Sequence, residues 1–294
     1  MIDKFLRALL AVVLACSLAA CEQLTKQNEI TTKSSPESAD TAVKTTTIEP
    51  EKDAHWDYEE DGPAKWGSLS KKYAICGEGK GQSPIDIENA STSELPEIET
   101  NFPSAELKII HHAHKADVEN TGHTIQVDYS EGDTLKMDGI DYALWQYHFH
   151  APSEHTVNGK HTAMEMHMVH RTADKKNLAV VGVLIEPGTQ TNSAFDPIWA
   201  NLPNKKSEKN HLENVEVDVN QLLPESKATY RYDGSLTTPP CSEKVKWVIF
   251  SNPIQLSAAQ IGKFTELIKE NNRPTQPLNG RMVKTDRIEE MDSN

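Results

Sequence analysis

The sequence predicts a mainly β domain with few short helices, preceded by an export signal and a tether. Between about residue 100 and the C-terminus, short runs alternate apolar and polar side chains, which is the period of a strand with one buried face. Glycine and proline separate these runs, and a single segment near the C-terminus repeats its apolar residues at helical spacing. A chain of this length fits one β-rich domain. We therefore expect a single domain over residues 54–294.

The first 20 residues are predicted to be a signal peptide. Lys4 and Arg7 give a positively charged start, and residues 8–20 are uncharged and mostly apolar. This run is shorter than the roughly 20 residues of a membrane-spanning helix, and it ends in small residues, as cleaved signals do. Residues 18–21, Leu-Ala-Ala-Cys, resemble a bacterial lipobox, which implies that Cys21 is lipidated. The alternative is an ordinary signal peptide that leaves Cys21 as a free thiol.

Residues 21–53 are predicted to form a lipidated N-terminus and a disordered tether. The segment consists largely of Thr, Ser, Glu and Lys, so it cannot bury enough apolar surface to offset the entropy of ordering it. Glu22 follows the cysteine, and by resemblance to other lipoproteins this favours the outer membrane. We expect an exported protein, lipid-anchored at the periplasmic face or the surface of a bacterial outer membrane. The membrane is then a partner through the anchor alone.

The overall charge excludes one class of partner. The formal net charge is −14, whereas a nucleic-acid-binding surface must be basic to neutralise phosphates. A small neutral substrate such as a dissolved gas is compatible with this charge.

The expected elements of the domain follow from the residue pattern. Ser257 is a plausible N-cap for a helix over residues 257–269, where Ile261, Phe264, Leu267 and Ile268 recur at three- to four-residue spacing. The expected strands cover residues 107–110, 124–129, 142–150, 163–170, 179–185, 215–217 and 246–250.

Three histidines in two of these strands have the spacing of a catalytic zinc site. Alternate side chains of a strand share a face, so His148 and His150 point the same way, and His167 lies on one face of the next strand. If the strands are neighbours, three imidazoles converge and a fourth coordination position stays open. Three protein ligands and an open position are typical of a catalytic zinc, whereas structural sites have four protein ligands.

Two polar residues on the same faces strengthen the zinc prediction. Gln146 precedes His148 by two residues and Glu165 precedes His167 by two, and metal-bound imidazoles usually give their other N–H to such acceptors. Two alternatives remain open. The His-x-His pair could belong to a half-exposed strand in a chain with 12 histidines, or Glu154 could complete a cupin-type iron or manganese site.

The cysteine count predicts one disulfide. Cys16 leaves with the signal peptide and Cys21 carries the lipid, so Cys76 and Cys241 remain. In an oxidising compartment two remaining cysteines form a disulfide, and the alternative is two free buried thiols.

Several separated motifs resemble those of the α-class carbonic anhydrases, in the order in which that family has them. The resemblance covers nearly all of residues 55–287 and, with the lipobox, indicates a bacterial lipoprotein type. It implies a large twisted, mostly antiparallel central sheet with a zinc site in a conical cleft. It also implies reversible hydration of carbon dioxide to bicarbonate and a proton by zinc-bound hydroxide, and a homodimer. The motifs are residues 66–67 (WG), 81–87 (GQSPIDI), 120–123 (NTGH), 146–150 (QYHFH), 153–157 (SEHTV), 165–167 (EMH), 234–241 (GSLTTPPC) and 273–278 (RPTQPL).

The same resemblance implies roles for further residues. His123 would be the proton shuttle, and Thr237 would orient the hydroxide together with Glu154. The backbone carbonyl of Asn271 would accept from His150. The alternative function is a non-catalytic surface binding lipoprotein on the same scaffold. Absence of a ligand histidine, of Glu154 or of Thr237 would favour this alternative, and the sequence retains all of them. The implied carbon dioxide pocket comprises Val169, Val180, Leu236, Thr238 and Trp247.

Overall fold

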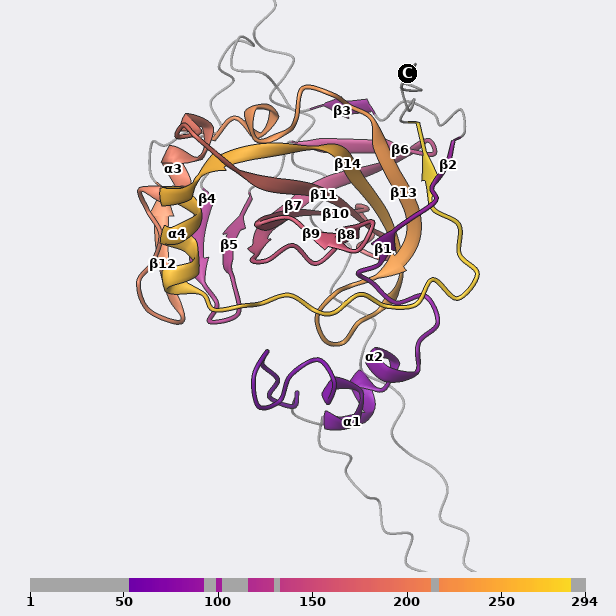
Figure 1. The fold of residues 1–294 in the computed structure, drawn as a ribbon. Coiled ribbons are helices and arrows are strands. Elements are labelled where there is room, and N and C mark those ends of the chain that lie inside the picture. The colour runs from indigo at the N-terminus through magenta and orange to yellow at the C-terminus, as the bar shows by residue number, and fades with distance from the viewer. Residues whose placement is uncertain (1–52, 93–98, 102–115, 130–132, 213–216, 287–294) are drawn as a thin grey trace, which may run out of the picture. The chain divides into compact units, whose positions relative to one another are not determined.

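The computed structural model describes residues 53–92, 99–101, 116–129, 133–212 and 217–286. Within them, one sheet of 12 strands dominates, with the strand order β12-β4-β5-β7-β10-β11-β14-β13-β15-β2 and with β3 and β6 attached beside β7. Figure 1 shows its long curved strands, of which β14 and β13 bend most visibly. Most neighbouring strands are antiparallel, while β11–β14 and β15–β2 are parallel. The predicted mainly β, mostly antiparallel architecture is confirmed.

The elements have the following bounds. The α-helices are α1 Trp66–Leu69, α2 Ile75–Glu78, α3 Asp196–Trp199 and α4 Ala258–Leu267, and the 3-10 helices are η1 Lys71–Tyr73, η2 Ser193–Phe195 and η3 Val219–Leu222. The strands are β1 Asp86–Ile87, β2 Ser91–Thr92, β3 Glu99–Asn101, β4 Ala116–Asn120, β5 Ile125–Asp128, β6 Thr134–Met137, β7 Ile140–His150, β8 Thr156–Val157, β9 Lys160–His161, β10 Met164–Arg171, β11 Leu178–Gly188, β12 Glu208–Leu212, β13 Thr229–Ser235, β14 Glu243–Ser257 and β15 Lys284–Thr285.

Five of the seven expected strands are present as β5, β7, β10, β11 and β14. The expected strand at 107–110 lies outside the described residues. Residues 215–216 of the expected strand at 215–217 also lie outside the described residues. Val217 is described and is not in a strand, so the prediction is wrong at that residue. Two-residue strands such as β1, β8 and β9, which form a separate small sheet, are too short to show a sequence period.

The predicted helix is α4, and its start has the expected cap. The Ser257 hydroxyl accepts from the Gln260 backbone amide at 3.2 Å, while the Gln260 side chain accepts from the Ser257 amide at 3.1 Å. This reciprocal pair satisfies two amides that the first turn of a helix leaves unpaired. Phe264 is fully buried and anchors the helix on the core. No helix in the described part of the chain has both the length and the apolar character to cross a bilayer.

Strand β10 separates the hydrophobic core from the polar site. Met164, Met166 and Met168 are 0% exposed and belong to the main core cluster, as the alternation predicts. Glu165 and His167 point to the opposite face and are also buried. Because both faces are covered, the functional side chains of this strand project from a rigid centre of the sheet.

Trp145 departs from strict alternation. Tyr147 and Phe149 are 0% exposed on the core face, but Trp145 is 42% exposed, with the Arg171 guanidinium 4.5 Å from its ring centre. The register between β7 and β10 shifts here, so β7 carries one extra residue. Such a bulge keeps the core face of β7 apolar on both sides of the irregularity.

We expect the buried His170 to make the fold sensitive to acid. Burial lowers the pKa of His170 from 6.5 to about 4. Between pH 6.5 and pH 4, the unfolded chain therefore binds a proton at this histidine more readily than the folded chain does. The contribution of His170 to the free energy of unfolding is complete above pH 6.5 and is lost as the pH drops towards 4. The loss contributed by this residue is about 3 kcal/mol. Urea unfolding of the wild type and of His170→Gln between pH 4.5 and 7.5 tests this: the variant should show the shallower pH dependence, and parallel curves would contradict the prediction.

Candidate metal centre and active site

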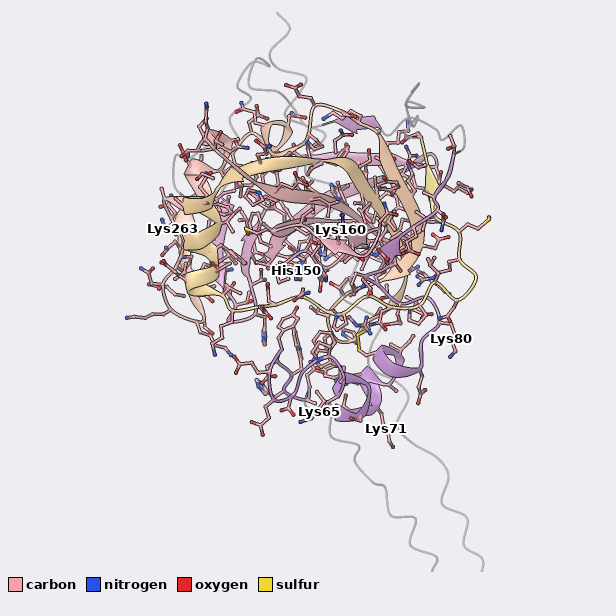
Figure 2. All side chains as sticks on the ribbon, in the orientation of Figure 1. Lys65, Lys71, Lys80, His150, Lys160 and Lys263 are labelled. Atoms are coloured by element: carbon pink, nitrogen blue, oxygen red, sulfur yellow. A yellow bond between two sulfur atoms is a disulfide. The ribbon has the colours of Figure 1, made fainter. Side chains whose placement is uncertain are left out.

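The three predicted ligand histidines converge on one face of the sheet. His148 and His167 are directly opposite each other on β7 and β10. One ligating nitrogen from each of His148, His150 and His167 lies within 4.8 Å of the others. The ring centres are 4.6 to 5.4 Å apart. Figure 2 shows the labelled His150 in the interior, whereas Lys65, Lys71 and Lys80 lie at the periphery.

Hydrogen bonds fix which nitrogen of His148 and of His150 faces the centre. Nδ1 of His148 is 2.8 Å from Oε1 of Gln146, and Nδ1 of His150 is 2.7 Å from the backbone oxygen of Asn271. Both oxygens accept, so each Nδ1 carries the proton. Nε2 of both rings therefore keeps its lone pair for a metal.

Glu165 fixes which nitrogen of His167 faces the centre, and here the hydrogen-bonded nitrogen is Nε2. Its Oε1 accepts from Nε2 of His167 at 2.9 Å and from Nδ1 of His155 at 2.7 Å. Its Oε2 accepts from the backbone amides of Glu154 and His155 at 2.9 and 2.8 Å. Burial by itself would raise the pKa of Glu165, but the facing His155 and His167 hold it well below its usual range. The ionised carboxylate leaves Nδ1 of His167 free to coordinate.

These donors fit a metal ion. Burial lowers the pKa of all three imidazoles, that of His150 to about 4, so they are neutral and can coordinate. Within the described residues, the buried Nε2 of His150 has no hydrogen-bond partner. An unsatisfied buried nitrogen costs free energy unless something else binds it. Three nitrogen ligands with such oriented outer partners are the donor set that zinc takes in catalytic sites.

Loss of the Gln146 acceptor should weaken metal binding. In Gln146→Ala, Nδ1 of His148 loses its partner and the ring is no longer held in one tautomer. We expect zinc affinity to fall roughly 10- to 100-fold. Competition with a chromogenic chelator measures it. Gln126→Ala is the matched control, because Gln126 projects beside His148 from β5 but bonds Asp128 at 2.7 Å. Equal affinities in both variants would contradict the role of Gln146.

Glu154 lies beside the ligand set. Its Oε2 is 3.5 Å from Nε2 of His150 and 3.7 Å from Nδ1 of His167, and its Oε1 accepts from the Arg273 backbone amide at 2.8 Å. Burial raises the pKa of Glu154 to about 7, while His167 and a hydrogen bond from Thr237 act to lower it. The carboxylate therefore joins the metal centre to the Thr237 hydroxyl.

Arg273 is a supporting residue that the sequence reasoning did not single out. Its guanidinium is 1% exposed and donates to the backbone oxygens of Cys76 and Ser83, both at 2.7 Å, and to Oε1 of Gln82 at 2.9 Å. It fixes these distant segments around the backbone amide that holds Glu154. Its partners are nearly 200 residues away in the sequence, so no local pattern indicated this role. The signal that was available is its place in the 273–278 motif.

The residues of the implied substrate pocket form an apolar wall next to the histidines. Val180 is opposite Val169 on β10 and opposite Trp247 on β14, so their side chains line one row across the sheet. All three are buried, and the partly buried Leu236 packs against them. Thr238 is partly exposed in the loop that follows β13.

His123 occupies the turn between β4 and β5 and is one of the residues that line a cavity of about 690 Å³. Its ring stacks on Trp56 with centres 4.1 Å apart and planes 16° from parallel. Burial, then Lys206 and His55, lower the pKa of His123, while Asp57 opposes them. Trp56 was not predicted to be functional. An aromatic residue beside a histidine at the start of the domain is too common a pattern to indicate one.

The predicted disulfide is present. Cys76 of α2 is bonded to Cys241, which directly follows the loop that carries Thr237. The Cys241 backbone amide donates to the Thr238 oxygen at 2.8 Å, so the bond holds that loop against the N-terminal helices.

A second cluster of ligating groups is internally satisfied. His155, Glu165 and His167 lie close enough to share an ion, but the hydrogen bonds of Glu165 already join them. Nε2 of His155 bonds the Tyr232 hydroxyl at 2.7 Å, so this buried histidine has partners at both ring nitrogens.

Comparison with known proteins supports the resemblance. The family model described as eukaryotic-type carbonic anhydrase matches residues 61–287. The chain is 43% identical to the carbonic anhydrases of Klebsiella pneumoniae and Neisseria gonorrhoeae, over 78% of this chain and 90% and 87% of theirs. The solved α-carbonic anhydrase from Thermovibrio ammonificans, bound to the inhibitor sulfanilamide, is 41% identical with a TM-score of 0.73, covering 79% of this chain and 100% of that one.

Proposed function

The chain belongs to the α-carbonic anhydrase family and is an enzyme of that class, and we propose that it catalyses reversible hydration of carbon dioxide with a zinc ion held by His148, His150 and His167. The observation that carries the metal assignment is the orientation of the three rings. Each has one nitrogen bonded to an acceptor and the other turned to a common point. Zinc bound there would act as a Lewis acid that lowers the pKa of a bound water, an effect for which carbonic anhydrases are the standard example.

Glu154 and Thr237 would orient the attacking oxygen. The Thr237 hydroxyl donates a hydrogen bond to Glu154, so its own oxygen is left to accept a hydrogen bond from the nucleophile. A nucleophile that must donate to Thr237 directs a lone pair elsewhere, towards the carbon that it attacks. Such fixed dipoles need no reorganisation during the reaction, and removing one typically costs roughly 100-fold in rate.

The remaining residues supply the substrate pocket and the proton exit. Val169, Val180 and Trp247 form a surface that favours apolar carbon dioxide over water. His123, which lines the cavity beside Trp56, would take the released proton to solvent, because an imidazole can both accept and donate near neutral pH.

The test of this proposal is stopped-flow carbon dioxide hydration by the full-length protein before and after zinc removal with a chelator. Fast hydration that disappears with the zinc and returns when zinc is added back is the expected result. A folded, zinc-loaded protein without activity would overturn the proposal and leave a binding lipoprotein on the same scaffold.

The proposed location rests on residues outside the described part of the structure. Lys4, Arg7 and the apolar run 8–20 support export, and Cys21 supports lipid anchoring at a bacterial outer membrane. Fractionation of cells that produce the wild type or Cys21→Ser tests this. The wild type should be found with membranes and the variant should be released, and equal distribution would contradict the anchor.

A further inference from the structure

Asn271 is a buried side chain whose role goes beyond the backbone oxygen that it offers to His150. It is 1% exposed and lies in the segment between α4 and β15. Its Oδ1 accepts from the Ala151 amide at 2.8 Å, and its Nδ2 donates to the backbone oxygens of Phe149 and of His123, both at 2.9 Å. Its own amide also donates to the Ala151 oxygen at 3.3 Å. Every polar group of the residue is therefore used.

These bonds join two parts of the active site that are far apart in sequence. Phe149 and Ala151 flank the ligand His150 at the end of β7, while His123 lies in the β4–β5 turn. The backbone oxygen of Asn271 fixes the His150 ring at 2.7 Å, and its side chain fixes the backbone of the His123 turn. One residue thus sets the position of the turn relative to the metal ligand.

One further side chain ties the turn to β7. The Thr124 hydroxyl donates to the Phe149 oxygen at 2.5 Å and accepts from the Phe149 amide at 3.2 Å. On its outer side, the ring of His123 rests on Trp56. Within the turn, the Thr121 hydroxyl accepts from the His123 amide at 3.2 Å, and the Asn271 bond reaches the backbone oxygen of His123 from outside the turn.

We propose that Asn271 is a positioning residue that holds the proton-accepting His123 at a fixed place relative to the metal-binding His150, an inference that rests on the proposed function. A proton transferred through ordered water needs a constant gap between donor and acceptor. Displacement of a catalytic group by about 1 Å can cost roughly 100-fold in rate. The attack on carbon dioxide does not involve His123, so this step should change little.

Asn271→Asp is the informative variant. It keeps the shape of the side chain and the acceptor for Ala151, but it removes both N–H donors and sets a carboxylate oxygen against two backbone oxygens. We expect kcat to fall roughly 10- to 100-fold while kcat/KM falls by less than about threefold. Proton release follows bicarbonate departure, so it limits kcat alone, and a high concentration of imidazole buffer should restore kcat. Asn279→Asp is the matched control, since the Asn279 side chain donates to the backbone oxygen of Lys80 at an exposed site.

Two further measurements separate positioning from general damage. In a double-mutant cycle, Asn271→Asp should add little to the loss of kcat caused by His123→Ala, because both act on one step. In the metal-free protein, amide hydrogen exchange in residues 121–124 should speed up about tenfold relative to the wild type, with no change in β14. If Asn271→Asp does not fold, Asn271→Ser loses the same donors without the added charge.

Equal losses in kcat and kcat/KM, additivity with His123→Ala, or unchanged exchange in the turn would each overturn the inference. The proposed function fails separately, if the zinc-loaded wild type does not hydrate carbon dioxide. In that case the exchange measurement still decides whether Asn271 holds the turn.

Discussion

Replacing His150 with alanine is expected to remove both the metal and the activity. Its Nε2 is a buried nitrogen with no hydrogen-bond partner among the described residues, and its Nδ1 is held by the Asn271 oxygen. Binding of zinc to a four-ligand site releases about 10–16 kcal/mol, so one ligand contributes on the order of 3 kcal/mol. Zinc affinity should therefore fall at least about 100-fold. Hydration should drop to the rate of the metal-free protein, as measured by metal analysis and stopped-flow kinetics.

Two control variants make this result specific. His161→Ala removes an exposed histidine whose Nδ1 bonds the Ser153 oxygen outside the site, and it should keep both zinc and activity. Glu154→Gln should keep zinc and lose activity, because Glu154 is proposed to orient Thr237 and is not one of the three converging histidines. Loss of metal in Glu154→Gln with retention in His167→Ala would favour the cupin-type site instead.

The ligand set could be predicted because it depends on local geometry. His148 and His150 share a face of one strand, and Gln146 lies on the same face two residues earlier, so alternation alone places all three. The remaining step is that β7 and β10 are neighbours. They are consecutive among the strands expected from the sequence, and consecutive strands usually pair, although the short β8 and β9 of the small sheet lie between them in the chain. The third ligand, His167, then needs no long-range information beyond that pairing.

The side-chain contacts that escaped prediction act across long sequence separations. Arg273 contacts backbone atoms of residues 76 and 83, and Asn271 contacts those of residues 123 and 149. Their donors bond backbone oxygens, which every residue offers, so no side-chain pattern marks the partner. Strict alternation fails at Trp145 for a different reason, because a bulge changes the period of β7 without any glycine or proline to signal it.

The burial of the metal-binding face explains why so many outer hydrogen bonds are present. Glu165 is 0% exposed and would be costly as an unpaired charge, yet four donors surround it. The tyrosine at position 232 extends this network, since its hydroxyl bonds both His155 and Ser83. The chain from His167 to Ser83 therefore ends in the 81–87 segment, whose Ser83 also accepts from the Ser235 amide of β13. The loop after β13 carries Thr237, so the proposed metal ligand His167 and the loop proposed to orient the nucleophile share one buried framework.

The disulfide braces that same loop from its other end. Cys241 is 0% exposed, and Gln82 donates to its backbone oxygen at 3.1 Å. Cys76 lies in α2, and its own backbone oxygen accepts from Arg273. Cys76 is thus tied to Arg273, whose backbone amide holds Glu154, and Cys241 is tied to Gln82 at the end of the loop that carries Thr237, so loss of the bond should affect activity as well as stability.

Cys76→Ser and Cys241→Ser are each expected to lower stability by about 4 kcal/mol, because the bond closes a loop over a sequence separation of 165 residues and restricts the unfolded chain. For a domain of this size the melting temperature should fall by about 10 °C. Turnover should fall less steeply, since the hydrogen bonds of Gln82 and Arg273 to the loop and to α2 remain. Thermal unfolding with and without reductant measures the effect: reductant should lower the melting temperature of the wild type towards that of the variants and leave the variants unchanged. A wild type that melts at the variants' temperature in oxidising buffer, or two free thiols besides any at Cys21 in the folded protein, would contradict the prediction.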